Sequence, residues 1–141
     1  MAAFVRESAV EAPMPPVSDA ELDVLKVLWK SGPATVRQVA GRLPRRRRRL
    51  AYNTILTLLS RLREKGYVTA DRGGTAHVFR ATVTREQLLR HGLTDLAERI
   101  CDGTRSTLVH ALVEGQRFSP QEIEGFRRLV EQLEPKNVSE D

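Results

Sequence analysis

The sequence is poor in the residues that mark secreted, membrane-spanning or zinc-binding proteins. Its 141 residues include one cysteine, Cys101, which excludes an intramolecular disulfide and a site built from several cysteine ligands. No apolar run approaches the roughly 20 residues that span a bilayer, and the N-terminus lacks the apolar core of a signal peptide. We therefore expect a cytoplasmic protein. Its core must be mainly aliphatic, because aromatic residues make up only 5% of the chain.

Motifs for catalysis and for metal binding are also missing. There is no glycine-rich phosphate loop and no nucleophile motif, and the three histidines, His77, His91 and His110, share no ligand spacing. We expect no enzymatic activity, no cofactor and no metal site. Cys101 is interpreted as a small packed hydrophobe, and a redox or intersubunit thiol is the alternative.

Acidic residues are scarce in one part of the chain. This uneven distribution is more informative about binding partners than the net charge of +5. Residues 35–80 contain 12 Lys and Arg against 2 Asp and Glu, whereas residues 83–141 contain 8 basic and 11 acidic residues. A basic segment joined to a slightly acidic one predicts a polyanionic partner for the first segment and a different role for the second.

The N-terminal part predicts two capped helices after a leader. Residues 1–17 carry several prolines and no periodicity, which indicates a flexible leader. Ser18 and Thr35 each open a capping box before a helical hydrophobic pattern, so a helix is expected to start after each of them. We expect the first helix to end before Gly32 and the second to end at Pro44.

A run of five arginines, residues 45–49, precedes a third predicted helix. This helix is expected over residues 52–65, with an apolar face on one side and a polar face on the other. Gly66 follows at the position where a helix commonly ends in a left-handed conformation.

A β-hairpin is predicted after the third helix, because the hydrophobic period changes to two. Residues 67–71 and 75–81 are the expected strands, and residues 72–74 between them are the expected turn. Three helices followed by a hairpin are the pattern of a winged helix-turn-helix, which we assign to residues 18–82. The predicted fold class is mainly α with a small β-hairpin.

The C-terminal part predicts three more helices. Capping sequences begin at Thr84 and Ser119, and a shorter helix closed by Gly115 is expected between them. These helices carry more apolar residues than so small a module can bury alone, so we expect residues 83–135 to be a dimerisation domain and residues 136–141 to be disordered. The residues expected at the dimer interface are Leu89, Leu93, Leu96, Ile100, Leu108, Leu112, Ile123, Phe126, Val130 and Leu133.

The polar face of the third helix carries the side chains that we predict to read DNA. A helix with one packed and one polar face fits the major groove, where Asn can pair with adenine, Thr can contact a thymine methyl group and Arg can bind guanine. The predicted base contacts are Asn53, Thr54, Thr57 and Arg61. The predicted phosphate contacts are Arg37, Arg45, Arg46, Arg47, Arg48, Arg49, Tyr52, Lys65 and Arg72, of which Tyr52 could instead cover the core.

Several segments resemble the BlaI/MecI/CopY family of bacterial repressors, also called the penicillinase repressor family. Residues 20–29 (AELDVLKVLW) resemble its opening helix and residues 35–39 (TVRQV) its second helix. Residues 51–62 (AYNTILTLLSRL) closely resemble its recognition helix, which is the most specific part of the match. Residues 119–124 (SPQEIE) extend the resemblance into the C-terminal part, so that it covers about residues 18–134.

The resemblance implies a homodimer that represses transcription by binding palindromic operators through its N-terminal winged helices. In β-lactam-responsive members a membrane sensor protease leads to cleavage of an Asn-Phe bond, but Ala111 and Leu112 stand at the matching position here. In copper-responsive members a C-terminal cysteine cluster binds metal, and the C-terminal tail of this chain has no cysteine. The arginine run is more basic than the family's turn, which favours non-specific affinity for DNA.

We therefore expect a sequence-specific DNA-binding repressor that acts as a homodimer on a palindromic operator. The alternative is a winged helix that serves as a protein-interaction or architectural module without sequence-specific readout. The alternative predicts that replacing Thr54 or Arg61 with alanine leaves DNA affinity unchanged.

Overall fold

The computed structural model describes residues 14–74 and 76–135, and the chain divides into two compact units between Leu96 and Ala97. This boundary lies inside a helix, later in the chain than the limit at residue 82 that the sequence predicted. The elements, in chain order, are α2 (Asp19–Ser31), α3 (Val36–Arg42), the 3₁₀ helix η1 (Arg45–Arg47), α4 (Tyr52–Glu64), β1 (Val68–Gly73), β2 (Ala76–Ala81), α5 (Arg85–Ile100), α6 (Arg105–Val113) and α7 (Pro120–Gln132).

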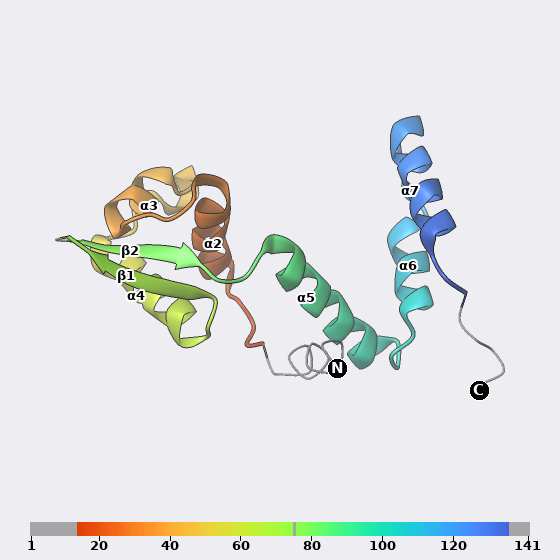
Figure 1. The fold of residues 1–141 in the computed structure, drawn as a ribbon, viewed down its shortest axis with the longest axis horizontal. Coiled ribbons are helices and arrows are strands. Elements are labelled where there is room, and N and C mark those ends of the chain that lie inside the picture. The colour runs from red at the N-terminus through yellow and green to blue at the C-terminus, as the bar shows by residue number, and fades with distance from the viewer. Residues whose placement is uncertain (1–13, 75, 136–141) are drawn as a thin grey trace. The chain divides into compact units, whose positions relative to one another are not determined.

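The first unit is the winged helix-turn-helix that the sequence predicted. Helices α2, α3 and α4 pack together, and the hairpin of β1 and β2 lies against them (Figure 1). Their apolar faces form one core from residues 24–83. The fold class is therefore mainly α with a small β-hairpin, as expected.

Short-range sequence signals set the starts of the helices. At the start of α2, the Ser18 hydroxyl accepts a hydrogen bond from the Glu21 backbone N–H at 3.2 Å, and the Glu21 carboxylate accepts one from the Ser18 N–H at 2.8 Å. The same reciprocal pair of bonds is present at Thr35, Thr84 and Ser119. All four predicted capping sequences are thus confirmed.

Helix α4 has no side-chain cap, and packing holds it in place instead. Its four buried side chains, at 3-1-3 spacing, face α2, α3 and β1. Burying each of them contributes about 2 kcal/mol, which exceeds the worth of a typical cap. These side chains are Ile55, Leu58, Leu59 and Leu62. The helix ends before Gly66, whose φ of 87° is left-handed, as predicted.

The hairpin is tighter than the sequence predicted. Arg72 and Gly73 lie in β1, opposite His77 and Ala76 of β2, so the predicted turn at residues 72–74 is wrong. Strand pairing continues past the residues with turn-forming character because each additional pair satisfies backbone hydrogen bonds. Arg72 is accordingly on a strand and not in a turn.

A backbone bridge that the sequence did not suggest fastens the hairpin to the helices. The Ala34 N–H donates to the Phe79 carbonyl at 2.9 Å, and the Phe79 N–H donates to the Ala34 carbonyl at 2.8 Å. Ala34 lies between α2 and α3, and both residues are buried. The wing is therefore held to the helices by hydrogen bonds as well as by apolar packing.

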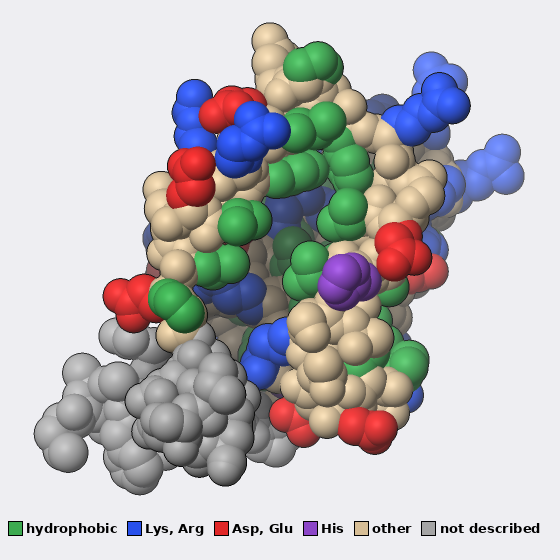
Figure 2. All heavy atoms as spheres, turned by 90° about the vertical axis from the view of Figure 1, so that its right-hand side faces the viewer, with side chains coloured by type: hydrophobic (Ala, Val, Ile, Leu, Met, Phe, Trp, Pro, Cys, Tyr) green, Lys and Arg blue, Asp and Glu red, His purple; other side chains and the backbone are tan. Residues whose placement is uncertain are grey.

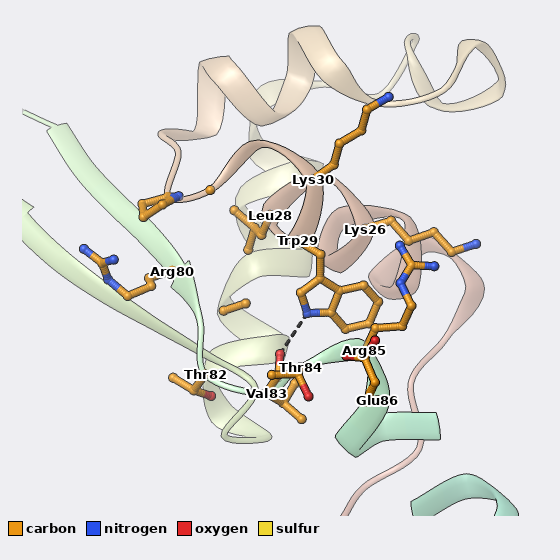
Figure 3. Close-up of a pocket in the computed structure, with 13 residues that line it drawn as sticks. Lys26, Leu28, Trp29, Lys30, Arg80, Thr82, Val83, Thr84, Arg85 and Glu86 are labelled. Carbon is orange, nitrogen blue, oxygen red and sulfur yellow. Dashed lines mark hydrogen bonds between the residues drawn. The ribbon is translucent and has the colours of Figure 1, made fainter. Parts of the chain in front are cut away.

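Trp29 holds the segment that leads into α5. Its indole Nε1 donates to the Val83 carbonyl at 2.8 Å, and Figure 3 shows the ring above the turn from Thr82 to Thr84. The Arg85 guanidinium lies 5.2 Å from the ring centroid, which is a cation–π distance. Trp29 is thus anchored at its polar end while its ring covers part of the core.

Residues 14–17 lie against the core, although the sequence predicted a flexible leader up to residue 17. Met14 and Val17 pack on the core of the winged helix. The Pro15 carbonyl accepts a hydrogen bond from the Tyr67 hydroxyl, and the Pro16 carbonyl accepts one from Lys65 Nζ. The remainder of the predicted leader, 1–13, and the predicted disordered tail lie outside the described residues.

The second unit buries almost nothing by itself. Between residues 97 and 135, Ala97 is the only residue that is fully buried. Phe118 and Phe126 meet edge to face with their ring centroids 5.0 Å apart. Figure 2, which looks onto the side of α6 and α7, shows hydrophobic side chains gathered on the surface. None of the described helices is both long and apolar enough to cross a membrane.

Replacing Gly66 with alanine tests the left-handed end of α4. A Cβ there would meet no atom within 4 Å, so the cost comes from backbone strain alone. We expect Gly66→Ala to lower the free energy of unfolding by about 1 kcal/mol in urea denaturation. Gly41→Ala is the matched control, because Gly41 also faces open space but lies within α3. It should raise stability by about 0.5–1 kcal/mol, and effects of the same sign would contradict this assignment.

Candidate nucleic-acid interface

One side of α4 is packed and the other is open to solvent. The side chains predicted to read bases, Asn53, Thr54, Thr57 and Arg61, are all exposed. At 100° per residue, Asn53 and Thr57 lie near the middle of the open face and Thr54 and Arg61 lie on one flank of it. The Thr57 hydroxyl donates to the Asn53 carbonyl at 2.9 Å, which leaves its methyl group and an oxygen lone pair for a partner. Glu64 is the one acidic side chain on the helix.

The other flank of α4 borders a groove that the helix shares with α3 and β2. Tyr52, Ser60 and Arg63 line it from α4, Thr35 and Arg37 from the start of α3, and His77 from β2. Tyr52 is 53% exposed, so it does not cover the core. Among the described residues, no acidic side chain lines this groove, a composition that suits a phosphodiester backbone.

Sequence reasoning did not assign four polar residues of this groove to the site: Thr35, which it took only as a helix cap, and Ser60, Arg63 and His77. Ser60 and Arg63 belong to the helix already identified, and the helical spacing from Tyr52 could have included them. His77 had no such signal, because only the fold of the hairpin places it opposite α4.

Three of the five arginines at residues 45–49 form side-chain hydrogen bonds within the protein. The Arg46 guanidinium donates to both carboxylate oxygens of Asp23, at 2.8 and 2.9 Å, and Arg47 Nε donates to one of them at 2.9 Å. Arg48 Nε donates to the Leu43 carbonyl at 3.0 Å. For the side chains of Arg45 and Arg49 the described part of the chain holds no hydrogen-bonding or ion-pair partner.

The remaining predicted phosphate contacts also include both side chains that bind within the protein and side chains that are exposed. Lys65 Nζ lies 2.7 Å from the Glu21 carboxylate and also donates to the Pro16 carbonyl. Arg37 on α3 and Arg72 on β1 are exposed. The structure therefore exposes the four predicted base-contact residues on one helix, and it places Arg46, Arg47 and Lys65 in internal ion pairs that the charge pattern did not predict.

Two buried carboxylates on α2 hold the segments at both ends of α4. Glu21 is 1% exposed and pairs beyond the end of the helix, at Lys65; Asp23 is 4% exposed and pairs before its start, at Arg46 and Arg47. Burial alone would raise the pKa of the Asp23 carboxyl, but its hydrogen bonds and charge attraction with Arg47 and Arg46 outweigh burial and lower that pKa. For Glu21, burial is likewise outweighed by bonds from Lys65 and Ser18, and its pKa is also lowered.

The residues that the structure describes contain no candidate metal site. Across residues 14–74 and 76–135, no three His, Cys, Asp or Glu side chains lie close enough to hold an ion. Cys101 is a free, half-buried thiol. The candidate site is consequently a surface of polar and basic side chains around α4 and the hairpin.

The fold places this chain in the class of winged helix-turn-helix proteins. Residues 17–132 match the family described as penicillinase repressor, and the chain belongs to that family. The relationship suggested by the recognition-helix segment is thereby confirmed over most of the chain.

The chain is also similar to individual proteins. The transcriptional regulator BlaI of Mycobacterium tuberculosis (strain ATCC 25618 / H37Rv) is 36% identical over 121 residues, which are 84% of this chain and 85% of the relative. The penicillinase repressor of Bacillus licheniformis is 27% identical over 119 residues, 84% of this chain and 92% of the relative. Among solved structures, the DNA-binding domain of the repressor BlaI is 31% identical with a TM-score of 0.47, over 53% of this chain and 90% of that one.

The two buried carboxylates predict how stability depends on pH. A lowered folded-state pKa contributes stability that is present above the ordinary pKa values, 4.5 for Glu21 and 3.8 for Asp23, and that is lost as pH falls through the folded values. We expect the free energy of unfolding in urea to fall steeply below about pH 4.5. Asp23→Asn should be destabilised at pH 7 and lose part of this pH dependence.

Asp71→Asn is the matched control for this measurement. Asp71 and its partner Arg80 are both exposed, and their charged atoms are 3.8 Å apart. Such a pair contributes about 0–1 kcal/mol, so the control should follow the unaltered protein. An Asp23→Asn profile that also follows the unaltered protein would contradict the structural role of Asp23.

Proposed function

We propose that this protein is a transcriptional repressor that inserts α4 into the major groove of DNA. The observation that carries the proposal is the exposed polar face of α4 beside a basic groove, in a chain that belongs to the penicillinase repressor family. In this proposal Asn53, Thr54, Thr57 and Arg61 read bases. Repression follows because a protein bound at a promoter excludes the polymerase.

We choose the proposed phosphate contacts by whether each side chain is exposed or lines the groove and is not already paired within the protein. Arg45 and Arg49 beside the start of α4, Arg37 on α3 and Arg72 on β1 are exposed, and Tyr52 lines the groove. We add Ser60, Arg63 and His77, because one DNA strand passing through the groove would meet all three. We leave out Arg46, Arg47 and Lys65, whose charges are paired with Asp23 and Glu21. Arg48, which bonds the Leu43 carbonyl, is a weaker candidate.

We also propose that the second unit forms a homodimer. Its described helices expose a series of large apolar side chains and bury almost none, which is costly in water unless a partner covers them. The proposed interface keeps the residues predicted from the sequence, including Leu89, Leu93 and Leu96 in the part of α5 that precedes the second unit. Leu93 and Leu108 are half-buried. Leu129 of α7, 62% exposed, belongs with them. A two-fold dimer would read a palindromic operator, one half-site per winged helix.

A sensor protease is not part of this proposal. Ala111 and Leu112 stand where cleavage would be expected, and both lie within α6. The domain limits of the proposal are a DNA-binding part at residues 18–82 and a dimerisation part at residues 83–135, with α5 continuing from one compact unit into the other.

DNA binding is tested with the duplex upstream of the protein's own gene, in competition with random-sequence DNA. We expect tighter binding to the upstream duplex in fluorescence anisotropy at moderate salt. Arg61→Ala and Asn53→Ala should each cost about 1–3 kcal/mol on that duplex and little on random DNA. Arg127→Ala, on α7, is the control and should bind as the unaltered protein does. Equal affinity for both duplexes in every variant would leave only the alternative, a protein-interaction or architectural module without sequence-specific readout.

Dimer formation is tested by placing a charge on the apolar face of α7. Val130 is 64% exposed, and Val130→Asp should convert a dimer into a monomer at micromolar concentration, measured by light scattering. Gln121→Asp places the same charge on the opposite face of α7 and should leave the mass unchanged. A monomeric unaltered protein would remove the proposed role of this unit.

A further inference from the structure

The five arginines before α4 are not equally available to DNA. Three of them, Arg46, Arg47 and Arg48, have a side-chain hydrogen bond within the protein. The side chains of Arg45 and Arg49 are exposed and have no such partner among the described residues. The run that looks uniform in sequence therefore contains two kinds of arginine.

One buried carboxylate, Asp23, creates most of this difference. It accepts three hydrogen bonds from two guanidinium groups, and its side chain is 4% exposed. Arg47 is 26% exposed and faces inward; Arg46 is 65% exposed but has one nitrogen bonded to both carboxylate oxygens. No other carboxylate contacts the run in the part of the chain that the structure describes.

Both arginines that bind Asp23 lie in a short 3₁₀ helix. Arg45, Arg46 and Arg47 form η1, in which the Arg47 N–H donates to the Pro44 carbonyl at 2.8 Å and the Arg48 N–H to the Arg45 carbonyl at 3.2 Å. Ala51, the N-cap residue of α4, follows four residues after η1. Asp23 thus joins α2 to the segment that delivers the N-terminus of α4.

A DNA phosphate can bind Arg47 only by competing with Asp23. Arg46 bonds Asp23 through one nitrogen and is 65% exposed, so it keeps further N–H groups, but the carboxylate offsets part of its charge. Removing a guanidinium from Asp23 would leave a carboxylate buried with fewer partners, which is strongly unfavourable. Phosphate contacts raise affinity for all sequences alike, because they carry no base information. A buried carboxylate that binds two of the five arginines and offsets part of their charge therefore lowers non-specific affinity without changing base readout.

We infer that Asp23 is a positioning residue that sets DNA specificity by sequestering Arg46 and Arg47, so that Arg45 and Arg49 make the phosphate contacts of the run. This inference rests on the proposed DNA-binding function. It explains how a turn with five consecutive arginines can serve a protein that must discriminate between sequences.

The salt dependence of binding to a short random-sequence duplex tests the inference. Each phosphate contact contributes about 0.9 to the slope of log affinity against log salt concentration. In the unaltered protein, Arg45→Ala and Arg49→Ala should each reduce the slope by about 0.9, whereas Arg46→Ala should leave it unchanged. Arg45 and Arg46 are adjacent and chemically identical, so each is a matched control for the other.

Asp23→Asn should release the two cations while keeping the size of the side chain. We expect the slope to steepen by about 1–2 and the affinity for random DNA to rise roughly tenfold, so that preference for the upstream duplex falls. In the Asp23→Asn protein, Arg46→Ala should now reduce the slope, which reverses its behaviour in the unaltered chain. A residue with only a structural role would instead weaken binding to both duplexes and leave the slope as it was.

Each result decides one claim. If the unaltered protein binds the upstream duplex preferentially but Arg46→Ala lowers the slope as much as Arg45→Ala, the sequestration is refuted and the repressor proposal stands. If the unaltered protein does not bind DNA, the proposed function itself fails. If Asp23→Asn does not fold, as judged by circular dichroism at the assay temperature, the comparison of Arg45→Ala with Arg46→Ala in the unaltered chain still decides.

Discussion

The winged helix depends on how α2 holds the two ends of α4. Glu21 and Asp23 are two residues apart on α2 and both are buried, yet one pairs with Lys65 after α4 and the other with arginines before it. Buried carboxylates are tolerated only when they are paired, so each of them requires its partner segment to lie in one place. Apolar packing along α4 supplies most of the burial energy, and these ion pairs specify where the helix starts and ends relative to α2.

The same constraint determines what remains on the surface for a partner. Once the core side of α4 and three of the neighbouring cations are used inside the protein, the open face carries short polar groups and the groove beside the hairpin carries arginines, a tyrosine and a histidine. The second unit has the opposite character, because its described helices have apolar faces and nearly no core. In the proposed function, base readout, phosphate contact and self-association would use separate surfaces, which suits a dimeric repressor.

Much of the fold could be predicted from the sequence because it depends on neighbours in the chain. The capping residues, the apolar stripes and Gly66 act over three or four positions, and the structure confirms them. The start of the hairpin turn was predicted two residues too early, since Arg72 pairs with His77 and Gly73, despite its turn-forming character, pairs with Ala76. The polar face of α4 was also readable from the sequence, whereas His77 joined the candidate site only through the hairpin.

By itself, the sequence determined the identity and order of the elements, the basic character of the first half and the resemblance to one repressor family. Only the tertiary structure decided which charges are free. Glu21 looked like a capping residue and Asp23 like an ordinary residue of a helix, but each meets a cation more than twenty positions away. Ion pairs between distant residues leave no periodic trace along the chain, because they arise only when packing has already brought the segments together.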